Sequence, residues 1–541
     1  MKGKSLMNTK KIAALLMALM MSISMIAGCG AEEEEAPAEE EQQAETTLPE
    51  AEKEEEHTAE DPEKAAHVDS LVLAMASEPT TLNPYDHAAV TSSYMNQLTY
   101  NKLFRLDIDT LEPVPDLCES YENIDDLTWR FKLKEGVKFH DGAELTAEDV
   151  KASLEYARTF TASDKYTKFW NTVEVIDPLT IEIKTHTPYA LILNDLAQNG
   201  NTILSKKLID EGNDFGLNPV GTGPYKFVEW VLGDKVIFTR NENYFDQAHQ
   251  PQITELVWRI IPEGTSRTIA LEAGEVDMII DVDTNDIARM DENEDIEVLS
   301  VPGTRMAFFG LNNEAAPFDN IDFRRAIMAA IDREAVMMVA VNGQGSVTTS
   351  PNPQTFRGAN ETGTIGYDVE AAKQYLAASG IDPTAVTFSC MTYTDETRRT
   401  AEVIQGMLQE IGLHMEIESL DFAAWLERLL AGDFEASVGG YTASDLLTYM
   451  KGMWHSISIG ASNLVRLNDS EIDAMIEQAE KTLDADARTE LLSQICTKIN
   501  EKALMVSLYT TTYVRAYNAG LQGMDVSASG YTMYQDLYWA E

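Results

Sequence analysis

Cys29 is the residue whose neighbours assign the clearest chemistry to its side chain. It follows two small residues and an apolar run over residues 12–28, which is too short to span a bilayer comfortably. The segment before that run carries four lysines and no acid. This arrangement is typical of a bacterial lipoprotein signal, in which the cysteine sulfur receives a diacylglyceryl group. We expect residues 1–28 to be a signal peptide and Cys29 to be the lipid anchor; an ordinary signal peptide with an incidental cysteine is the alternative.

Catalytic and metal-binding chemistry has no comparable pattern. The sequence contains no G-x-S-x-G, H-E-x-x-H or C-x-x-C motif and no glycine-rich phosphate loop. The eight histidines are scattered, and His140 is expected in an exposed turn. With 90 Asp and Glu residues, close pairs of acids arise by chance. We therefore expect a protein that is not an enzyme and that needs neither a cofactor nor a metal.

An acidic segment separates Cys29 from the rest of the chain. Between residues 31 and 66, sixteen acids stand against two lysines, and few apolar residues could be buried. Such a segment repels itself and is expected to stay disordered. We interpret residues 29–66 as the lipidated cysteine with a tether on the outer face of the cell membrane. The length of the tether favours a Gram-positive-type surface over a periplasm.

The composition of the whole chain excludes one class of partner. A net charge of −49 would repel the phosphates of nucleic acids. Beyond Cys29 there are only Cys118, Cys390 and Cys496, far apart in the sequence. We expect three buried thiols, with a single disulfide as the alternative.

The elements that must position a site alternate between strand and helix patterns. Strands are predicted at 71–77, 129–134, 180–185, 235–240, 253–261 and 414–420. Helices are predicted after Thr146, whose partner in a capping box is Asp149, and over 322–341 with a break near Asp332. Others should end at Gly380, cover 395–413 and form a pair over 469–503. The region before about 310 is richer in strands, and the pattern predicts a two-lobed α/β protein.

Several segments, in order along the chain, resemble those of the extracellular solute-binding proteins, family 5, of ABC importers for oligopeptides, dipeptides and nickel. They are "EPTTLNPYD" at 78–86, "WRFKLKEGVKFHDGAELTAEDVKAS" at 129–153, "NPVGTGPYKF" at 218–227, "LEAGEVDMI" at 271–279 and "LNNEAAPFDNIDFRRAIMAAIDRE" at 311–334. The resemblance implies a periplasmic-binding-protein-like fold of type II, cluster C type, with the ligand in a cleft between the lobes. It also implies a monomer whose partners are ABC permease subunits with cytoplasmic ATPases.

The resemblance further implies domain boundaries. Lobe I would comprise residues 67–310, with an inserted subdomain at about 105–215. Lobe II would comprise residues 311–507, and residues 508–541 would return to lobe I.

The same resemblance locates the position that decides the cargo. Family members that bind peptides carry an aromatic residue, two further residues and an aspartate that meets the ligand's amine. Here Tyr441 matches the aromatic, but Ser444 replaces the acid and Asp445 follows it. Oligopeptide binders often carry an arginine three residues before the aromatic, and Val438 occupies that position here. Asp445 either takes over the amine or is a solvated loop acid.

Other residues expected in the cleft come from matching positions after each motif. They are Val90, Tyr94, Asp281, Asp283, Phe422, Trp425, Tyr509 and Thr511. Each aromatic among them could instead belong to a core, but together they would form an apolar-walled pocket with a few acids, which favours neutral or cationic cargo. A peptide is the first expectation; a glycoside, another small organic solute or a metal chelate is the alternative. A surface sensor with the same fold would be a different function.

Overall fold

The computed structural model describes residues 69–87, 89–280 and 282–540. These residues belong to one compact unit, Lys64–Glu541. The expected signal peptide, Cys29 and the tether lie outside the described residues, as does Asp281. In the part that is described, no helix has both the length and the apolar character needed to cross a membrane.

An eleven-stranded sheet runs through the whole unit. Its order is β15-β14-β16-β12-β17-β11-β1-β10-β9-β8, and β13 pairs with β17. The strands are β1 (Ser70–Met75), β8 (Tyr225–Val231), β9 (Lys235–Arg240), β10 (Glu255–Ile260), β11 (Met278–Ile279), β12 (Ile296–Leu311), β13 (Gly345–Val347), β14 (Thr387–Thr392), β15 (His414–Ser419), β16 (Ala436–Tyr441) and β17 (Met505–Asn518).

Lobe I contains the β1, β8–β11 part of this sheet and a separate four-stranded sheet. That second sheet has the order β4-β5-β7-β6, with β4 (Cys118–Asp125), β5 (Thr128–Leu133), β6 (Trp170–Asp177) and β7 (Thr180–Thr185). Two short pairs are β2 (Phe104–Leu106) with β3 (Pro113–Pro115), and β18 (Leu521–Gln522) with β19 (Tyr538–Trp539). The helices are α2 (Val90–Thr99), α3 (Ala147–Ala157), α4 (Asp164–Thr167), α5 (Ile192–Leu196), α6 (Lys206–Asp210), α7 (Gly264–Glu272) and α8 (Ile287–Asp291).

Lobe II contains β13–β16 and eight helices of the described chain. They are α9 (Ile321–Ala330), α10 (Arg333–Val341), α11 (Val369–Ser379), α12 (Asp395–Glu410), α13 (Phe422–Ala431), α14 (Leu446–Trp454), α15 (Ser470–Lys481) and α16 (Ala485–Glu501). Its two apolar cores lie on β12, β14 and β16 and on the helices around them. The two-lobed α/β fold predicted from the sequence is therefore confirmed.

The local signals in the sequence were reliable. Thr146 and Asp149 form the predicted capping box at the start of α3. Asp332 breaks the apolar stretch between α9 and α10 because its side chain caps α10 through the Ala335 N–H. Gly380 ends α11 in the left-handed conformation, as predicted. Cys118, Cys390 and Cys496 are buried free thiols, and burial raises their thiol pKa to about 12.

His140 departs from the expectation of an exposed turn. Its ring is half-buried, with Nε2 3.0 Å from the carbonyl of Gly223 and Nδ1 3.4 Å from the amide of Gly221. Burial lowers its pKa to about 4. These two contacts attach the turn at residue 140 to the Gly221–Gly223 corner. That corner also packs tightly against α2, since a Cβ at Gly221 would lie 2.1 Å from the Thr99 carbonyl oxygen.

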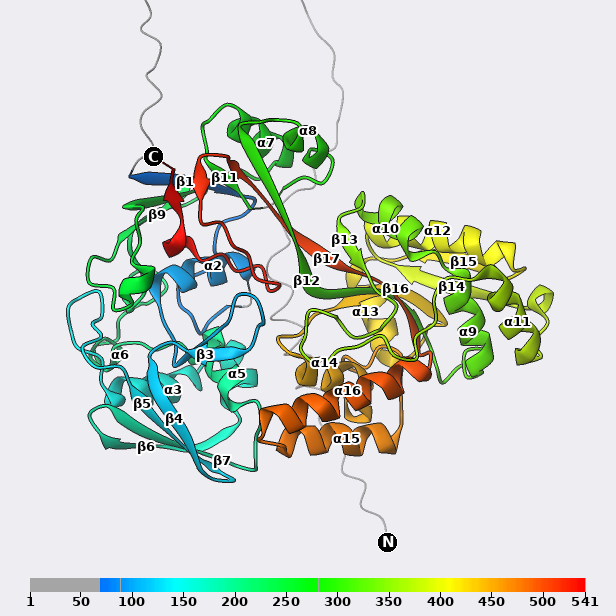
Figure 1. Cartoon of the computed structure of the whole chain (residues 1–541), viewed down its shortest axis with the longest axis horizontal. Coiled ribbons are helices and arrows are strands. Elements are labelled where there is room, and N and C mark those ends of the chain that lie inside the picture. Colours follow the sequence, from blue (N-terminus) through cyan, green and yellow to red (C-terminus); the bar gives the residue numbers. More distant parts are fainter. Residues whose placement is uncertain (1–68, 88, 281, 541) are drawn as a thin grey trace, which may run out of the picture. The chain divides into compact units, whose positions relative to one another are not determined.

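β12 and β17 are the long strands that link the two groups of elements (Figure 1). They pair antiparallel over most of their length. Between Pro302 and Met306 of β12, the partner advances only from Thr512 to Thr510, so residues 303–305 form a bulge. A bulge turns side chains away from the regular alternation of a strand, and bulges are frequent beside functional sites.

Candidate ligand-binding site

The carboxyl ends of two strands define where a ligand can bind in lobe II. β14 pairs parallel with both β15 and β16, so β14 and β16 end at the same edge of the sheet. The segments that leave this edge lead into α12 and α14. In open α/β sheets, ligands bind outside the carboxyl ends of the strands.

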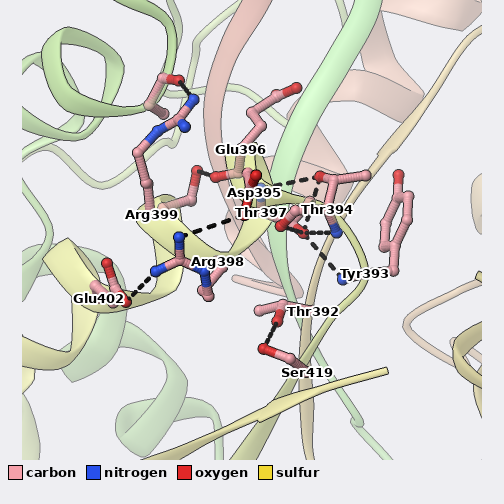
Figure 2. Close-up of polar contacts among 12 residues, drawn as sticks. Thr392, Tyr393, Thr394, Asp395, Glu396, Thr397, Arg398, Arg399, Glu402 and Ser419 are labelled. Carbon is pink, nitrogen blue, oxygen red and sulfur yellow. Dashed lines mark hydrogen bonds and ion pairs between the residues drawn. The ribbon is translucent and has the colours of Figure 1, made fainter. Parts of the chain in front are cut away.

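Figure 2 shows the start of α12 at this edge. Thr394 is the N-cap of the helix, and its hydroxyl lies 3.1 Å from that of Thr397. Arg398, on the outer face of the helix, pairs with Asp395 and Glu402. Glu396 has a different role. Its carboxylate accepts a hydrogen bond of 3.0 Å from the Tyr509 hydroxyl of β17. Burial, together with this carboxylate, raises the pKa of Tyr509.

Arg305 lies in the bulge of β12 and faces this edge. Its guanidinium occupies the space where a side chain at Gly440 of β16 would begin: a Cβ there would lie 2.6 Å from the Arg305 Cζ. The positive charge of Arg305 lowers the pKa of both Tyr509 and Tyr513, although burial raises both overall. Among the described residues, the guanidinium makes no hydrogen bond or ion pair. The site therefore presents a cation without an ion-pair partner, whose charge acts on Tyr509, and the Glu396 carboxylate, which is bonded to the Tyr509 hydroxyl.

The residues predicted to bind the ligand's amine lie at the end of β16 and in the segment that follows it. Tyr441 packs edge-on against Tyr449 of α14, with ring centroids 5.3 Å apart. Ser444 donates a hydrogen bond of 2.9 Å to Asp445, and Asp445 caps α14 by accepting from the Thr448 amide at 2.8 Å and the Thr448 hydroxyl at 2.7 Å. Both oxygens of Asp445 are therefore engaged by the helix start.

The predicted aromatics occupy different environments. Trp425 is buried in a lobe II core and donates a hydrogen bond of 2.8 Å to Ser437, while Phe422 is 53% exposed. Both contact the ring of Tyr393, which follows β14, with centroids 4.3 and 5.4 Å away. Tyr94 is buried in lobe I and stacks on Trp258, whereas Val90 is exposed at the start of α2.

The remaining predicted residues lie on β17 and near α7. Thr511 is half-buried on β17, where it pairs with Gly345, and it lies between Tyr509 and Tyr513 in the sequence. Asp283 accepts hydrogen bonds of 2.9 Å from the amide and the side chain of Asn285. The structure thus brings Tyr509 and Thr511 to the site around Arg305, and it gives Asp283 a local role in a turn.

Sequence reasoning missed Arg305, Tyr393, Glu396 and Tyr513. Arg305 could have been suspected, because "PGT" precedes it inside a strand pattern and an isolated glycine in a strand signals a bulge. Glu396 looked like an ordinary first-turn acid of a helix. Nothing in the sequence connects it with Tyr509, which is 113 residues away.

The lobes also touch beside the site. The Ala190 amide donates a hydrogen bond of 2.9 Å to the carbonyl of Glu480 in α15, and Leu191 packs into a lobe II core. Next to them, the Tyr189 hydroxyl donates a hydrogen bond of 2.7 Å to the carboxylate of Asp195. Burial, together with the negative charge of Asp445 from lobe II, raises the pKa of Asp195 to about 8, although the hydrogen bond from Tyr189 lowers it.

This contact should weaken as the pH rises. A carboxyl whose pKa is about 8 in the folded state keeps a proton that the unfolded chain releases near pH 4. The contribution of Asp195 to the free energy of unfolding is therefore fully present below about pH 4 and is lost as the pH rises through 8. We expect the denaturation midpoint of wild type to fall more steeply between pH 5 and 9 than that of Asp195→Asn. Equal slopes by urea titration would contradict this expectation.

The chain was compared with known proteins. Residues 112–460 match the family described as bacterial extracellular solute-binding proteins, family 5. The glutathione-binding protein of Salmonella paratyphi A is 28% identical over 476 residues, covering 84% of this chain and 91% of that protein. The heme-binding protein A of Haemophilus influenzae is 27% identical over 513 residues, covering 88% and 93%. The structure of HbpA2 from Haemophilus parasuis superposes with a TM-score of 0.81 at 25% identity, covering 87% of this chain and 100% of that one.

Proposed function

Because the chain belongs to family 5 of the bacterial extracellular solute-binding proteins, whose members serve ABC importers, we propose that it captures a short peptide outside the cell and delivers it to an ABC permease. Members of this family are exported. The observation that supports the peptide assignment is the presence of two opposite charges near Tyr509: the Arg305 guanidinium, which has no ion-pair partner in the described chain, and the Glu396 carboxylate, which accepts from the Tyr509 hydroxyl.

Two opposite charges in one site match the two ends of a peptide. Arg305 would receive the terminal carboxylate, since a guanidinium binds carboxylates through two parallel hydrogen bonds. Glu396 would receive the terminal amine, because its only side-chain partner in the described structure is Tyr509. Arg305 thus supplies a cation against Gly440, two residues along β16 from Val438, where the expected arginine is missing.

Closure of the lobes would complete the site. Lobe II contributes Glu396 and Gly440, and β12 and β17 contribute Arg305, Thr511 and Tyr513. A ligand that contacts both lobes favours the closed state by its difference in affinity for the two states. The permease would then recognise the closed protein.

The anchor is a separate part of the proposal. A diacylglyceryl group on Cys29 and the acidic segment up to residue 66 would hold the receptor at the membrane surface. Its support is the sequence alone, since both lie outside the described residues. The mass of the membrane-extracted chain should include the acyl groups, and Cys29→Ala should lack them.

Native mass spectrometry tests the assignment of the cargo. We expect the purified protein to retain a peptide, or to gain the mass of one from a mixed peptide pool at neutral pH. The matched control is the same pool after acetylation of the amines and amidation of the carboxylates, which removes both charges. A protein that ignores both pools but binds a sugar or another uncharged solute would contradict the peptide assignment.

A further inference from the structure

Lobe I contains a cavity of about 150 Å³ away from the site described above. Its lining comes from residues 97–249 and 527–535, so no residue of lobe II or of β12 takes part. The lining includes residues at and beside β2, β3 and β5, residues 244–249 and the C-terminal segment. The cavity therefore lies between segments of lobe I that are far apart in the sequence.

Three cations converge on this cavity. Lys102, Arg105 and Lys134 line it, and none of them forms an ion pair with another described residue. This is unusual in a chain with 90 acids and 41 basic residues, where an acid is seldom far from a lysine or arginine. Lys102 is half-buried, and burial lowers the pKa of its ammonium. An unpaired cation removed from water is costly unless an anion compensates it.

The acids of the lining supply only part of that compensation, since the negative charge of Asp116 raises the pKa of Lys102 while burial lowers it overall. Asp116 is buried and accepts hydrogen bonds of 3.1 Å from the side chain of Asn101 and from the backbone amide of Lys102. Asp246 accepts a hydrogen bond of 3.2 Å from the Ala248 amide. His249 pairs at 2.7 Å with Asp536, which lies outside the lining. The ammonium and guanidinium groups are thus left with no carboxylate partner within 4.0 Å in the described chain.

We propose that this cavity is a second binding site, which takes a small organic carboxylate of about amino-acid size. Lys102, Arg105 and Lys134 hold the carboxylate. The side-chain nitrogens of Gln97 and Gln198 donate to the carbonyls of Thr532 and Asn194, so their amide oxygens would accept hydrogen bonds from the rest of the molecule, and the ring of Tyr244 would pack against its carbon atoms. A volume of about 150 Å³ suits a molecule no larger than a six-membered ring.

This site goes beyond the proposed function and does not depend on it. No residue that we assign to peptide binding lines the cavity. A bound carboxylate would contact both the segments around β2, β3 and β5 and the C-terminal segment, and so would add contacts between them. Its expected effect is a higher unfolding temperature of lobe I, with or without a peptide in the other site.

The test is calorimetric titration of the full chain with acetate, succinate and glutamate, with succinamide as the uncharged match for succinate. We expect at least one acid to bind wild type and to raise its unfolding temperature, and succinamide to do neither. Lys102→Met with Arg105→Met should weaken binding about tenfold or more. Lys138→Met, an exposed lysine outside the lining, should leave binding unchanged, as should Arg305→Met.

Two further readouts keep the result clear. Lys102→Met also removes the positive charge that acts on the buried Asp116, so the unfolding temperature of the unliganded variant is measured beside its affinity and any loss of stability is kept apart from the loss of binding. Gln198→Glu leaves all three cations in place but adds a negative charge to the lining. This variant should therefore also bind the acid more weakly than wild type. The proposal is overturned if no acid binds, if succinamide binds as tightly as succinate, if both charge variants bind like wild type, or if Arg305→Met abolishes binding.

Discussion

Arg305→Met should weaken binding of the peptide cargo by about 30-fold or more. Removing one partner of a desolvated, hydrogen-bonded charge pair costs roughly 2–5 kcal/mol, and about 1.4 kcal/mol corresponds to a factor of ten. Methionine keeps much of the length of the side chain while removing the charge and the donors. The guanidinium has no partner among the described residues, so the unliganded protein should lose no stability. Calorimetric titration of wild type and variant checks the loss of affinity.

A second substitution moves the charge without deleting it. The Cβ of Gly440→Ala would lie 2.6 Å from the Arg305 Cζ, so the guanidinium must shift. We expect this variant to bind more weakly than wild type but more tightly than Arg305→Met. Arg398→Met is the matched control, because Arg398 is exposed on α12 and pairs with Asp395 and Glu402. Affinity within about twofold of wild type in Arg305→Met would refute the role of Arg305.

Arg515→Met should lower the free energy of unfolding by about 3 kcal/mol or more. Arg515 is 1% exposed on β17. Its guanidinium donates hydrogen bonds of 3.0 Å to the carbonyl of Ile280 and 2.7 Å to the carbonyl of Gly530. Arg515 therefore attaches the C-terminal segment and the residue after β11 to β17. Methionine would leave both carbonyls without this donor inside the protein. Urea denaturation, followed by circular dichroism, measures the loss.

The control for stability is again Arg398→Met, since an exposed pair on a helix contributes little. We expect that variant to unfold within about 0.5 kcal/mol of wild type. Equal urea midpoints for Arg515→Met and Arg398→Met would show that the C-terminal segment does not depend on Arg515. Loss of peptide affinity in folded Arg515→Met would be a separate consequence, because Tyr513 is its neighbour.

The fold could be predicted where its signals are local. Capping by Thr146 and Asp149, the break at Asp332 and the end of a helix at Gly380 each depend on residues a few positions apart. The alternation of strands and helices indicated an α/β fold, but of β14, β15 and β16 only β15 was predicted, and their parallel pairing was found in the structure. His140 was misplaced because its partners, Gly221 and Gly223, lie about 80 residues away.

The site was harder to predict because it depends on contacts between distant strands. Arg305 gains its position from a bulge that exists only in the pairing of β12 with β17, and from the missing side chain at Gly440. Periodicity cannot separate a core aromatic such as Trp425 from an exposed one such as Phe422, since both open the same helix. The capping role of Asp445 was readable, because Thr448 follows three residues later. Its part in ligand binding stays a prediction, and so does that of Asp281.

In the proposed function, Arg305 binds the carboxylate of a peptide. The most direct measurement is calorimetric titration of wild type and Arg305→Met with the peptide identified by native mass spectrometry and with its C-terminal amide, which differs only in the missing charge. We predict that wild type prefers the acid by about tenfold or more and that Arg305→Met binds the two forms alike. An equal preference for the acid in both proteins would show that another residue binds the carboxylate and would contradict the claim.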